Sequence, residues 1–337
     1  IGAAGAADID TTIGTLVATN NTSGNIFVQE TNGLIIGGTG VRTLGGSGNI
    51  NVDVIAGDLN VNSLVSANGT GNVRLQTEAA NGDIVANAVV QSGTGHISLL
   101  AGDDLNQNSN IATGGVGTVY LLAANTTADA ISGVDMAAGT NVTTAGGNVR
   151  VLAQNNGDIR LGLIGVGAGN VSLIASRSIL DANGASLNVA ANNLRMVATS
   201  GTIGDADTLN GTPDINANAI DTQVTTLASI SATGIYVREA DGITIDNTDT
   251  IGILQVNIDA STTAVSDSSL EDLTTTNNGP IKLQSLTGDI FVNPGSLVAF
   301  GIQANGTGDI LLQTLAANGD IVVNAVVRSL TGHISLS

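Results

Sequence analysis

The chain has 337 residues, with 45 glycines, 3 prolines, no cysteine and only 1% aromatic residues. Its net charge of −19, from 9 basic and 28 acidic side chains, disfavours nucleic acid and anionic membrane surfaces as partners. Without cysteine there are no disulfides or thiolate metal sites, and no apolar run is long enough for membrane insertion. The aliphatic content is nevertheless high: 42% of residues are hydrophobic, which argues against disorder.

The first recurring element in the chain is a short strand that begins after a glycine. Gly24, Gly48, Gly71, Gly95 and Gly117 each precede a polar residue and then alternating apolar and polar residues, at intervals of 22 to 24. A period of two places one face of each strand inside. Because glycine tolerates a positive φ, we expect the corner glycines to adopt one. Coils of about 23 residues with two or three short strands predict an all-β parallel β-helix (β-solenoid) of about 14 or 15 coils.

A longer repeat is superimposed on the coils. Residues 70–99 return as 307–336 and match at 23 of 30 positions, at an offset of 237. Upstream, residues 26–36 return as 235–245 at an offset of 209. The difference of 28 residues indicates an insertion in the second copy, and a solenoid tolerates an added unit because each coil touches only its neighbours.

The repeat also suggests a division of the chain. We assign residues 1–219 to a first super-repeat and 220–337 to a second, incomplete one. The insertion is expected as an extra coil around residues 246–280. The stretch 201–219, which contains a proline and clustered Asp and Asn, breaks the pattern and is expected as an irregular junction loop.

Several of these segments resemble a known class of repeat. The turns TGNV (70–73), NGDI (81–84) and TGHI (94–97), and the stretch 201–228 followed by 235–245, resemble the β-helical repeats of giant bacterial surface proteins. These are the filamentous-haemagglutinin-like and autotransporter-like proteins, and the resemblance covers nearly the whole chain. It implies a right-handed parallel β-helix that is secreted to the extracellular space or cell surface. It further implies a role in adhesion, a surface layer, a sheath or a matrix fibre.

Either Asp or Asn fills most of the corner positions that follow a glycine. Asp and Asn alternate there without regard to charge, which predicts a turn-forming role that needs an acceptor oxygen. The residues in this slot are Asp58, Asp83, Asp158, Asp289, Asp309, Asp320, Asn25, Asn49, Asn72, Asn148 and Asn170.

A functional interpretation of the carboxylates is a calcium site, because hard cations bind several oxygens. No cofactor is required by the sequence, and the tandem calcium-binding nonapeptide does not occur. Calcium is the ion that local acidic pairs would accept. The candidate ligands are Asp103, Asp104, Asp205, Asp207, Asp246 and Asp249.

No residue stands out as catalytic. His96 and His333 occupy the same position in two copies of one coil, so we interpret both as turn or outward-facing strand residues. Glycoside hydrolysis needs a carboxylate pair at a defined separation, and no unique pair is distinguishable from the repeated ones. Glu30 and Glu239 also recur in matched positions, which we interpret as a packing feature of that coil.

The sequence therefore predicts a non-enzymatic structural shaft of an extracellular or cell-surface filament, sheath or matrix fibre. Both ends of the fragment would expose unpaired strand edges, so identical copies in end-to-end or lateral contact are the expected partners. The alternative is the stalk of an adhesin whose binding tip lies elsewhere, with a polysaccharide or host surface as partner. A third, less favoured function is a polysaccharide-active β-helix enzyme.

Overall fold

The computed structural model describes all residues except 4–6, 128–132, 206–217 and 296–299. The described residues form strands, turns and loops, and contain no helix that meets the length and hydropathy needed to cross a bilayer. They divide into two compact units. Unit 1 comprises residues 1–157, 165–169 and 252–266, and unit 2 comprises 158–164, 170–251 and 267–337.

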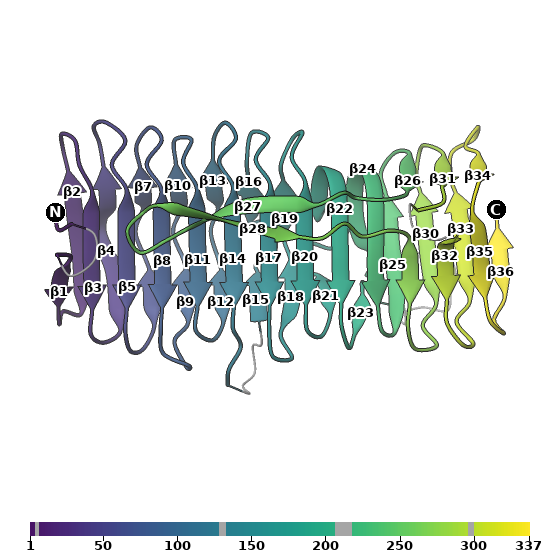
Figure 1. Cartoon of the computed structure of the whole chain (residues 1–337), viewed down its shortest axis with the longest axis horizontal. Helices are drawn as coiled ribbons and strands as arrows, with labels where there is room; N and C mark the ends of the chain where they lie inside the picture. Colours follow the sequence, from purple (N-terminus) through teal and green to yellow (C-terminus); the bar gives the residue numbers. More distant parts are fainter. Residues whose placement is uncertain (4–6, 128–132, 206–217, 296–299) are drawn as a thin grey trace. The chain divides into compact units, whose positions relative to one another are not determined.

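Unit 1 is a right-handed parallel β-solenoid, as the sequence predicted (Figure 1). Its strands are short, because each corner interrupts the extended chain after three to six residues in most coils. The strands are β1 (Ile9–Thr11), β2 (Thr15–Asn20), β3 (Ile26–Glu30), β4 (Leu34–Thr43), β5 (Ile50–Val54), β6 (Leu59–Val61), β7 (Val65–Ala67), β8 (Val73–Thr77), β9 (Ile84–Ala86), β10 (Val90–Ser92), β11 (Ile97–Ala101), β12 (Leu105–Gln107), β13 (Ile111–Thr113), β14 (Val119–Ala123), β15 (Gly133–Met136), β16 (Asn141–Thr143) and β17 (Val149–Ala153).

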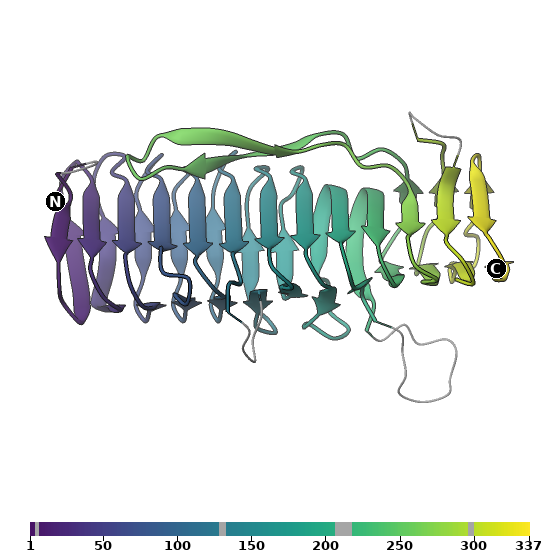
Figure 2. The ribbon, with the colours of Figure 1, turned by 60° about the horizontal axis from the view of Figure 1, so that its bottom comes forward.

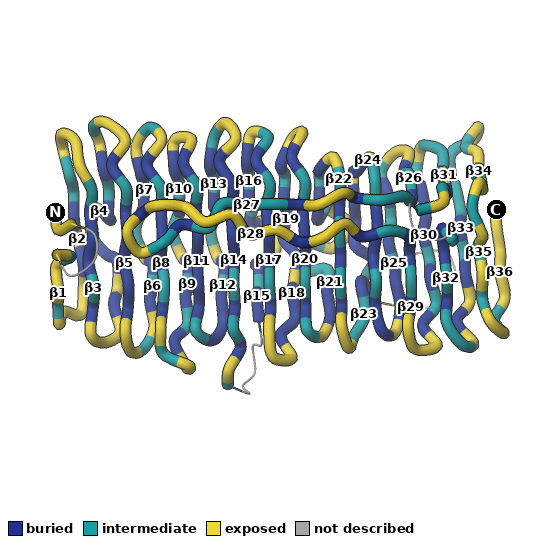
Figure 3. Tube along the Cα trace, in the orientation of Figure 1, coloured by how far each residue is buried: buried dark blue, intermediate teal, exposed yellow. Residues whose placement is uncertain are grey.

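The interior of unit 1 consists of ladders of aliphatic side chains. Ile26 pairs with Ile50, Ile50 with Val73, Val73 with Ile97 and Ile97 with Val119, so successive turns take 24, 23, 24 and 22 residues. All five side chains are 0% exposed. Figure 3 shows the strands of these coils as mostly buried and the turns between them as exposed. Small and β-branched side chains suit this interior because they pack well on pleated strands that stack a few ångströms apart.

Unit 2 is also a parallel solenoid, but its turns are less regular. Most of its residues in regular structure lie in β18 (Asp158–Leu161), β19 (Leu163–Gly165), β20 (Val171–Ala175), β21 (Ile179–Asp181), β22 (Val189–Ala198), β23 (Thr202–Ile203), β24 (Ile220–Ser231), β25 (Gly234–Glu239), β26 (Ile243–Ile245), β29 (Leu273–Thr275), β30 (Ile281–Ser285), β31 (Ile290–Val292), β32 (Phe300–Ala304), β33 (Ile310–Thr314), β34 (Ile321–Val323), β35 (Val326–Ser329) and β36 (Ile334–Leu336).

The pairing in unit 2 corrects the expected number of coils. Ile235 pairs with Ile281 across 46 residues, Ile281 with Ile310 across 29, and Ile310 with Ile334 across 24. Turns that carry loops or insertions consume more residues than the regular ones. Dividing the chain length by 23 therefore overestimates the number of coils, and 14 or 15 is too many.

The corner glycines are required mainly by contact between coils. A Cβ on Gly95 would lie 2.2 Å from the carbonyl oxygen of Gly71, and a Cβ on Gly71 would lie 2.1 Å from the carbonyl oxygen of Gly48. None of these three glycines has a positive φ, in contrast to our expectation. The backbones approach so closely at this corner that no side chain fits between them, which is the second role of glycine in strands.

Residues 246–280 do not form the extra coil that the sequence analysis expected. They contain a two-stranded hairpin, β27 (Ile251–Val256) and β28 (Thr262–Asp267), which is a separate sheet outside the coil. We call residues 252–266 the arm. Figure 1 shows the arm across the outer face of β8, β11, β14 and β17, and Figure 2 shows it as a second layer over that face.

Both polar and apolar contacts hold the arm on unit 1. The backbone N–H groups of Leu254 and Val256 donate to Thr118 Oγ1 (3.0 Å) and Ser98 Oγ (2.9 Å), and Asn148 Nδ2 donates to the Gly252 carbonyl (2.7 Å). An apolar cluster joins the arm to the coils: Ile253 and Val265 of the arm pack with Leu100, Tyr120, Leu122 and Leu152 of the coils. Ile253 and Val265 cover outward-facing apolar side chains of the coils, so the arm packs on the face of the solenoid instead of adding a turn to it.

We predict that Gly95→Ala destabilises unit 1, because its Cβ would overlap the Gly71 carbonyl at 2.2 Å. The loss should be about 1–3 kcal/mol, as for overpacked cores, measured by urea denaturation. Gly165→Ala is the control, since it has no heavy atom within 4 Å of the added Cβ and no positive φ. Equal effects of the two substitutions would contradict the steric explanation.

A second prediction concerns the arm. Ile253→Ala removes a side chain that is 2% exposed, so we expect a cavity cost of about 2 kcal/mol or more and faster hydrogen exchange in residues 252–266. Ile258→Ala, at a residue that is 39% exposed, is the matched control and should change exchange little. If both variants exchange like the parent chain, the apolar cluster does not hold the arm.

Candidate functional site

The corner Asn and Asp residues form hydrogen-bonded ladders along the coils. Asn49 N–H donates to Asn25 Oδ1 (2.9 Å), Asn72 N–H to Asn49 Oδ1 (2.8 Å) and His96 N–H to Asn72 Oδ1 (2.8 Å). At another corner Asp83 N–H donates to Asp58 Oδ1 (3.1 Å). Amide and carboxylate oxygens serve equally in this role, so the predicted need for an acceptor oxygen is confirmed. The donor is the backbone N–H of the next coil and not of the residue's own turn.

Both histidines belong to these ladders. His96 Nδ1 lies 2.9 Å from Thr118 Oγ1, and burial lowers the pKa of the ring. His333 N–H donates to Asp309 Oδ1 (2.7 Å), and its exposed ring Nδ1 lies 3.3 Å from the same oxygen. The backbone N–H of each histidine therefore makes the same corner contact. The rings have different partners, Thr118 for His96 and Asp309 for His333, so they do not form a repeated catalytic pair.

The candidate calcium ligands Asp103 and Asp104 bind the chain's own donors. Asp103 Oδ1 accepts from Thr127 N–H (2.9 Å) and Oδ2 from the Thr127 hydroxyl, while Asp104 Oδ1 accepts from Gly133 N–H (2.6 Å). Both aspartates are at most 2% exposed. Their carboxylates therefore bind donors of Thr127 and Gly133 and are not free to hold an ion.

The other candidates do not converge either. Asp205 N–H donates to the Asn218 carbonyl (2.9 Å), Asp249 N–H donates to Asn247 Oδ1 (2.7 Å), and Asp207 lies outside the described residues. Asp246 accepts from its own turn and from Asn293 Nδ2 (3.2 Å). In the part of the chain that the structure describes, no three His, Asp or Glu side chains are arranged to hold a metal ion.

Two matched glutamates, Glu30 and Glu239, have a defined structural role. Thr11 pairs with Glu30 between β1 and β3, and Thr222 pairs with Glu239 between β24 and β25. Each glutamate is 0% exposed. Glu30 Oε2 accepts from the Thr11 hydroxyl (2.6 Å), and Glu239 Oε2 accepts from the Thr222 hydroxyl (2.7 Å).

Each carboxyl also binds a backbone N–H two residues after the threonine, at Ile13 (3.0 Å) and Val224 (3.2 Å). The packing feature interpreted from the sequence is thus a carboxyl latch that holds a neighbouring strand. The latch supplies an acceptor to backbone donors that the strand ladder leaves unpaired.

The two latches differ in their ionisation. Burial raises the pKa of Glu239 to about 8, and a side-chain hydrogen bond with Asp241 adds to the rise against the lowering by Thr222. For Glu30, burial acts in the same direction, but hydrogen bonds from Thr11 and from three backbone N–H groups outweigh it and lower the pKa. Asn32 replaces Asp241 in the first latch, so Glu30 has no neighbouring carboxylate at that position.

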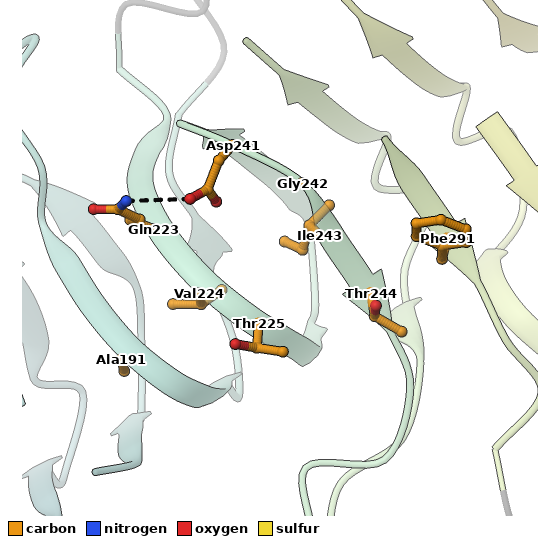
Figure 4. A pocket seen from close by; sticks show the side chains of 9 residues that line it. All are labelled: Ala191, Gln223, Val224, Thr225, Asp241, Gly242, Ile243, Thr244 and Phe291. Atoms are coloured by element: carbon orange, nitrogen blue, oxygen red, sulfur yellow. Dashed lines mark hydrogen bonds between the residues drawn. The ribbon is translucent and has the colours of Figure 1, made fainter. Parts of the chain in front are cut away.

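Asp241 also lines a surface groove in unit 2, shown in Figure 4. Its volume is about 510 Å³, and its walls come from β22, β24, β26 and β31. At one end Gln223 Nε2 donates to Asp241 Oδ2 (3.1 Å). At the other end lies the ring of Phe291, which is 37% exposed. The lining residues are Ala191, Gln223, Val224, Thr225, Asp241, Gly242, Ile243, Thr244 and Phe291.

Sequence reasoning did not find this groove, although one signal was available. Phe291 is one of only three phenylalanines, and it falls at an outward position of an alternating strand. The groove needs residues from four strands that lie up to 100 positions apart, so their proximity depends on the register between coils. The arm was missed for a similar reason, since the length of an insertion does not reveal which face it covers.

Comparisons with protein-family models, with curated proteins and with solved structures each returned no match to this chain.

We predict opposite pH effects at the two latches. The pKa of Glu239 is raised to about 8 in the folded state, so its contribution to stability is present at low pH and is lost as pH rises from about 4.5 to 8. Glu239→Gln removes this ionisation. The melting temperature of the variant should therefore fall less than that of the parent chain between pH 5 and pH 9.

Glu30→Gln is the matched control with the opposite sign. The folded pKa of Glu30 is lowered, so its ionised form stabilises the fold above the unfolded pKa, and this contribution is lost as pH falls. This variant should be less stable than the parent at pH 7, with the deficit shrinking in acid. The same pH profile for both variants would show that the environments of the two carboxyls do not differ.

Proposed function

We propose that the chain is part of the structural shaft of an extracellular or cell-surface filament, sheath or matrix fibre. The observation that carries the proposal is the repetition of coil contacts within each unit: aliphatic ladders inside, and Asn and Asp ladders at the corners. Each coil binds only its neighbours, so such an architecture extends without a new core. Backbone hydrogen bonds then run along the stack and resist extension.

The chemistry of the described side chains supports a mechanical role. Several corner and buried carboxylates accept hydrogen bonds from the chain itself, as Asp103, Asp104 and Glu30 illustrate. The net charge of −19 favours a soluble surface that repels anionic partners. In the proposal, identical copies of the chain are the partners in the assembly, and no catalytic group or cofactor takes part.

The resemblance to filamentous-haemagglutinin-like and autotransporter-like repeats agrees with secretion to the cell surface, which is part of the proposal. An adhesin stalk is the second candidate, and the groove of unit 2 is the observation that favours it. A polysaccharide-active enzyme is the least favoured function. Among the described residues, three carboxyls have strongly raised pKa values: Glu239 at about 8, and Asp53 and Asp272 at about 6. All three residues are at most 5% exposed, and both oxygens of Glu239 are hydrogen-bonded within the protein.

The proposal is tested by immunolabelling and cryo-electron microscopy of material from the cell surface, with an antibody against this chain. Labelled fibres with an axial spacing of about 4.8 Å between strands are expected. Labelling confined to compact particles or to the cell interior would refute the shaft. If the parent chain cleaves a polysaccharide and a Glu239→Gln variant does not, the chain is an enzyme instead.

A further inference from the structure

The groove of unit 2 combines two kinds of surface at its ends. Gln223 and Asp241 offer amide and carboxylate groups, and both side chains are exposed. Phe291 presents part of its ring, and Thr244 is its partner in the ladder between β26 and β31. Figure 4 shows the polar pair and the ring at opposite ends of the same hollow. A volume of about 510 Å³ is within the range of about 300–1,000 Å³ for small-ligand sites.

This arrangement matches the two surfaces of a sugar ring. Hydroxyl groups at the edge of a pyranose donate to carboxylates and exchange hydrogen bonds with amides. The C–H face of the same ring packs on an aromatic face, whose partial negative charge attracts the C–H groups. The Asp241 side chain accepts a hydrogen bond from Gln223, which reduces the side-chain freedom that it loses on binding.

Charge and backbone pairing narrow the class of ligand. The groove is lined by one carboxylate and no cationic side chain, which disfavours phosphate, sulfate and uronic acid groups. An extended peptide would need a free strand edge for β-augmentation. Here β26 pairs with both β24 and β31, and β31 pairs with β34, so the described strands of the groove floor have no free edge.

The super-repeat provides an internal comparison. Asp241 matches Asn32, and Thr244 matches Ile35, at the offset of 209. Ile35 pairs with Asn60 as Thr244 pairs with Phe291, so Asn60 occupies the place of the ring. The latch recurs in both copies, whereas the combination of carboxylate, hydroxyl and ring occurs at these positions only in the second copy. The coil architecture therefore does not require it.

We propose that the groove formed by Gln223, Asp241, Thr244 and Phe291 binds a neutral carbohydrate chain, with Phe291 packing on a sugar ring and Asp241 accepting from its hydroxyls. The inference goes beyond the shaft, and it stands or falls separately from it. A shaft with this groove would attach to, or be decorated by, a polysaccharide along its side.

The proposal is tested by isothermal titration of the whole chain with cellohexaose, maltohexaose, mannohexaose and chitohexaose. We expect at least one of these oligosaccharides to bind with Kd of about 1 mM or tighter. Phe291→Asn and Asp241→Asn should each weaken that binding at least tenfold. Both substitutions install side chains that the first super-repeat already carries at the matched positions, so the fold should persist and the melting temperature serves as the check.

Leu315→Ala is the control for a general loss of exposed apolar surface, because Leu315 is 52% exposed and lies outside the groove. This variant should bind as the parent does. The proposal is overturned if none of the four oligosaccharides binds. It is also overturned if binding survives both groove substitutions, or if only polygalacturonate or an extended peptide binds. If microscopy shows labelled fibres, the shaft proposal stands even when the carbohydrate proposal is overturned.

Discussion

The close approach of successive coils at their glycine corners constrains the rest of the structure. A Cβ on Gly95 would meet the carbonyl of Gly71 at 2.2 Å, so the backbones lie in direct contact there. Coils that stack at strand spacing bring equivalent residues into register, which places aliphatic side chains on aliphatic side chains and acceptors beneath donors. The interior ladders and the Asn and Asp corner ladders both follow from this spacing. Charge can vary at the corner, because the carboxamide and the carboxylate present the same acceptor oxygen.

The two copies of the super-repeat show how one local structure acquires different chemistry. Glu30 and Glu239 bind equivalent threonine hydroxyls and equivalent backbone N–H groups, yet the pKa is lowered at one and raised to about 8 at the other. Asp241 in place of Asn32 supplies a neighbouring carboxylate to the second latch. The same Asp241 reaches the surface and lines the groove. Burial is the main cause of the raised pKa of Glu239, while Asp241 adds to that rise through its side chain and also changes the exposed surface.

The side chains at outward-facing positions differ more from coil to coil than those that face the interior. Inward positions are restricted by the narrow interior, whereas outward ones are limited only by what covers them. On unit 1 the outward side chains of Leu100 and Tyr120 are apolar, and the arm covers them with Ile253. On unit 2 the exposed ring of Phe291 remains accessible in the groove. A solenoid can therefore keep its frame while different faces are closed or opened to partners.

The sequence by itself determined the fold class, the period of the regular coils and the acceptor role of the corner Asn and Asp. These features depend on contacts between residues one coil apart. In unit 1 such residues lie 22 to 24 positions apart, so the spacing of the repeat in the sequence predicts the contacts directly. The tertiary structure alone decided the steric reason for the corner glycines, the arm at residues 252–266 and the groove at Asp241 and Phe291. Each depends on distances across coils or on the face that an insertion covers. Residue spacing does not encode those, because the length of a loop fixes neither its direction nor the register of the strands it joins.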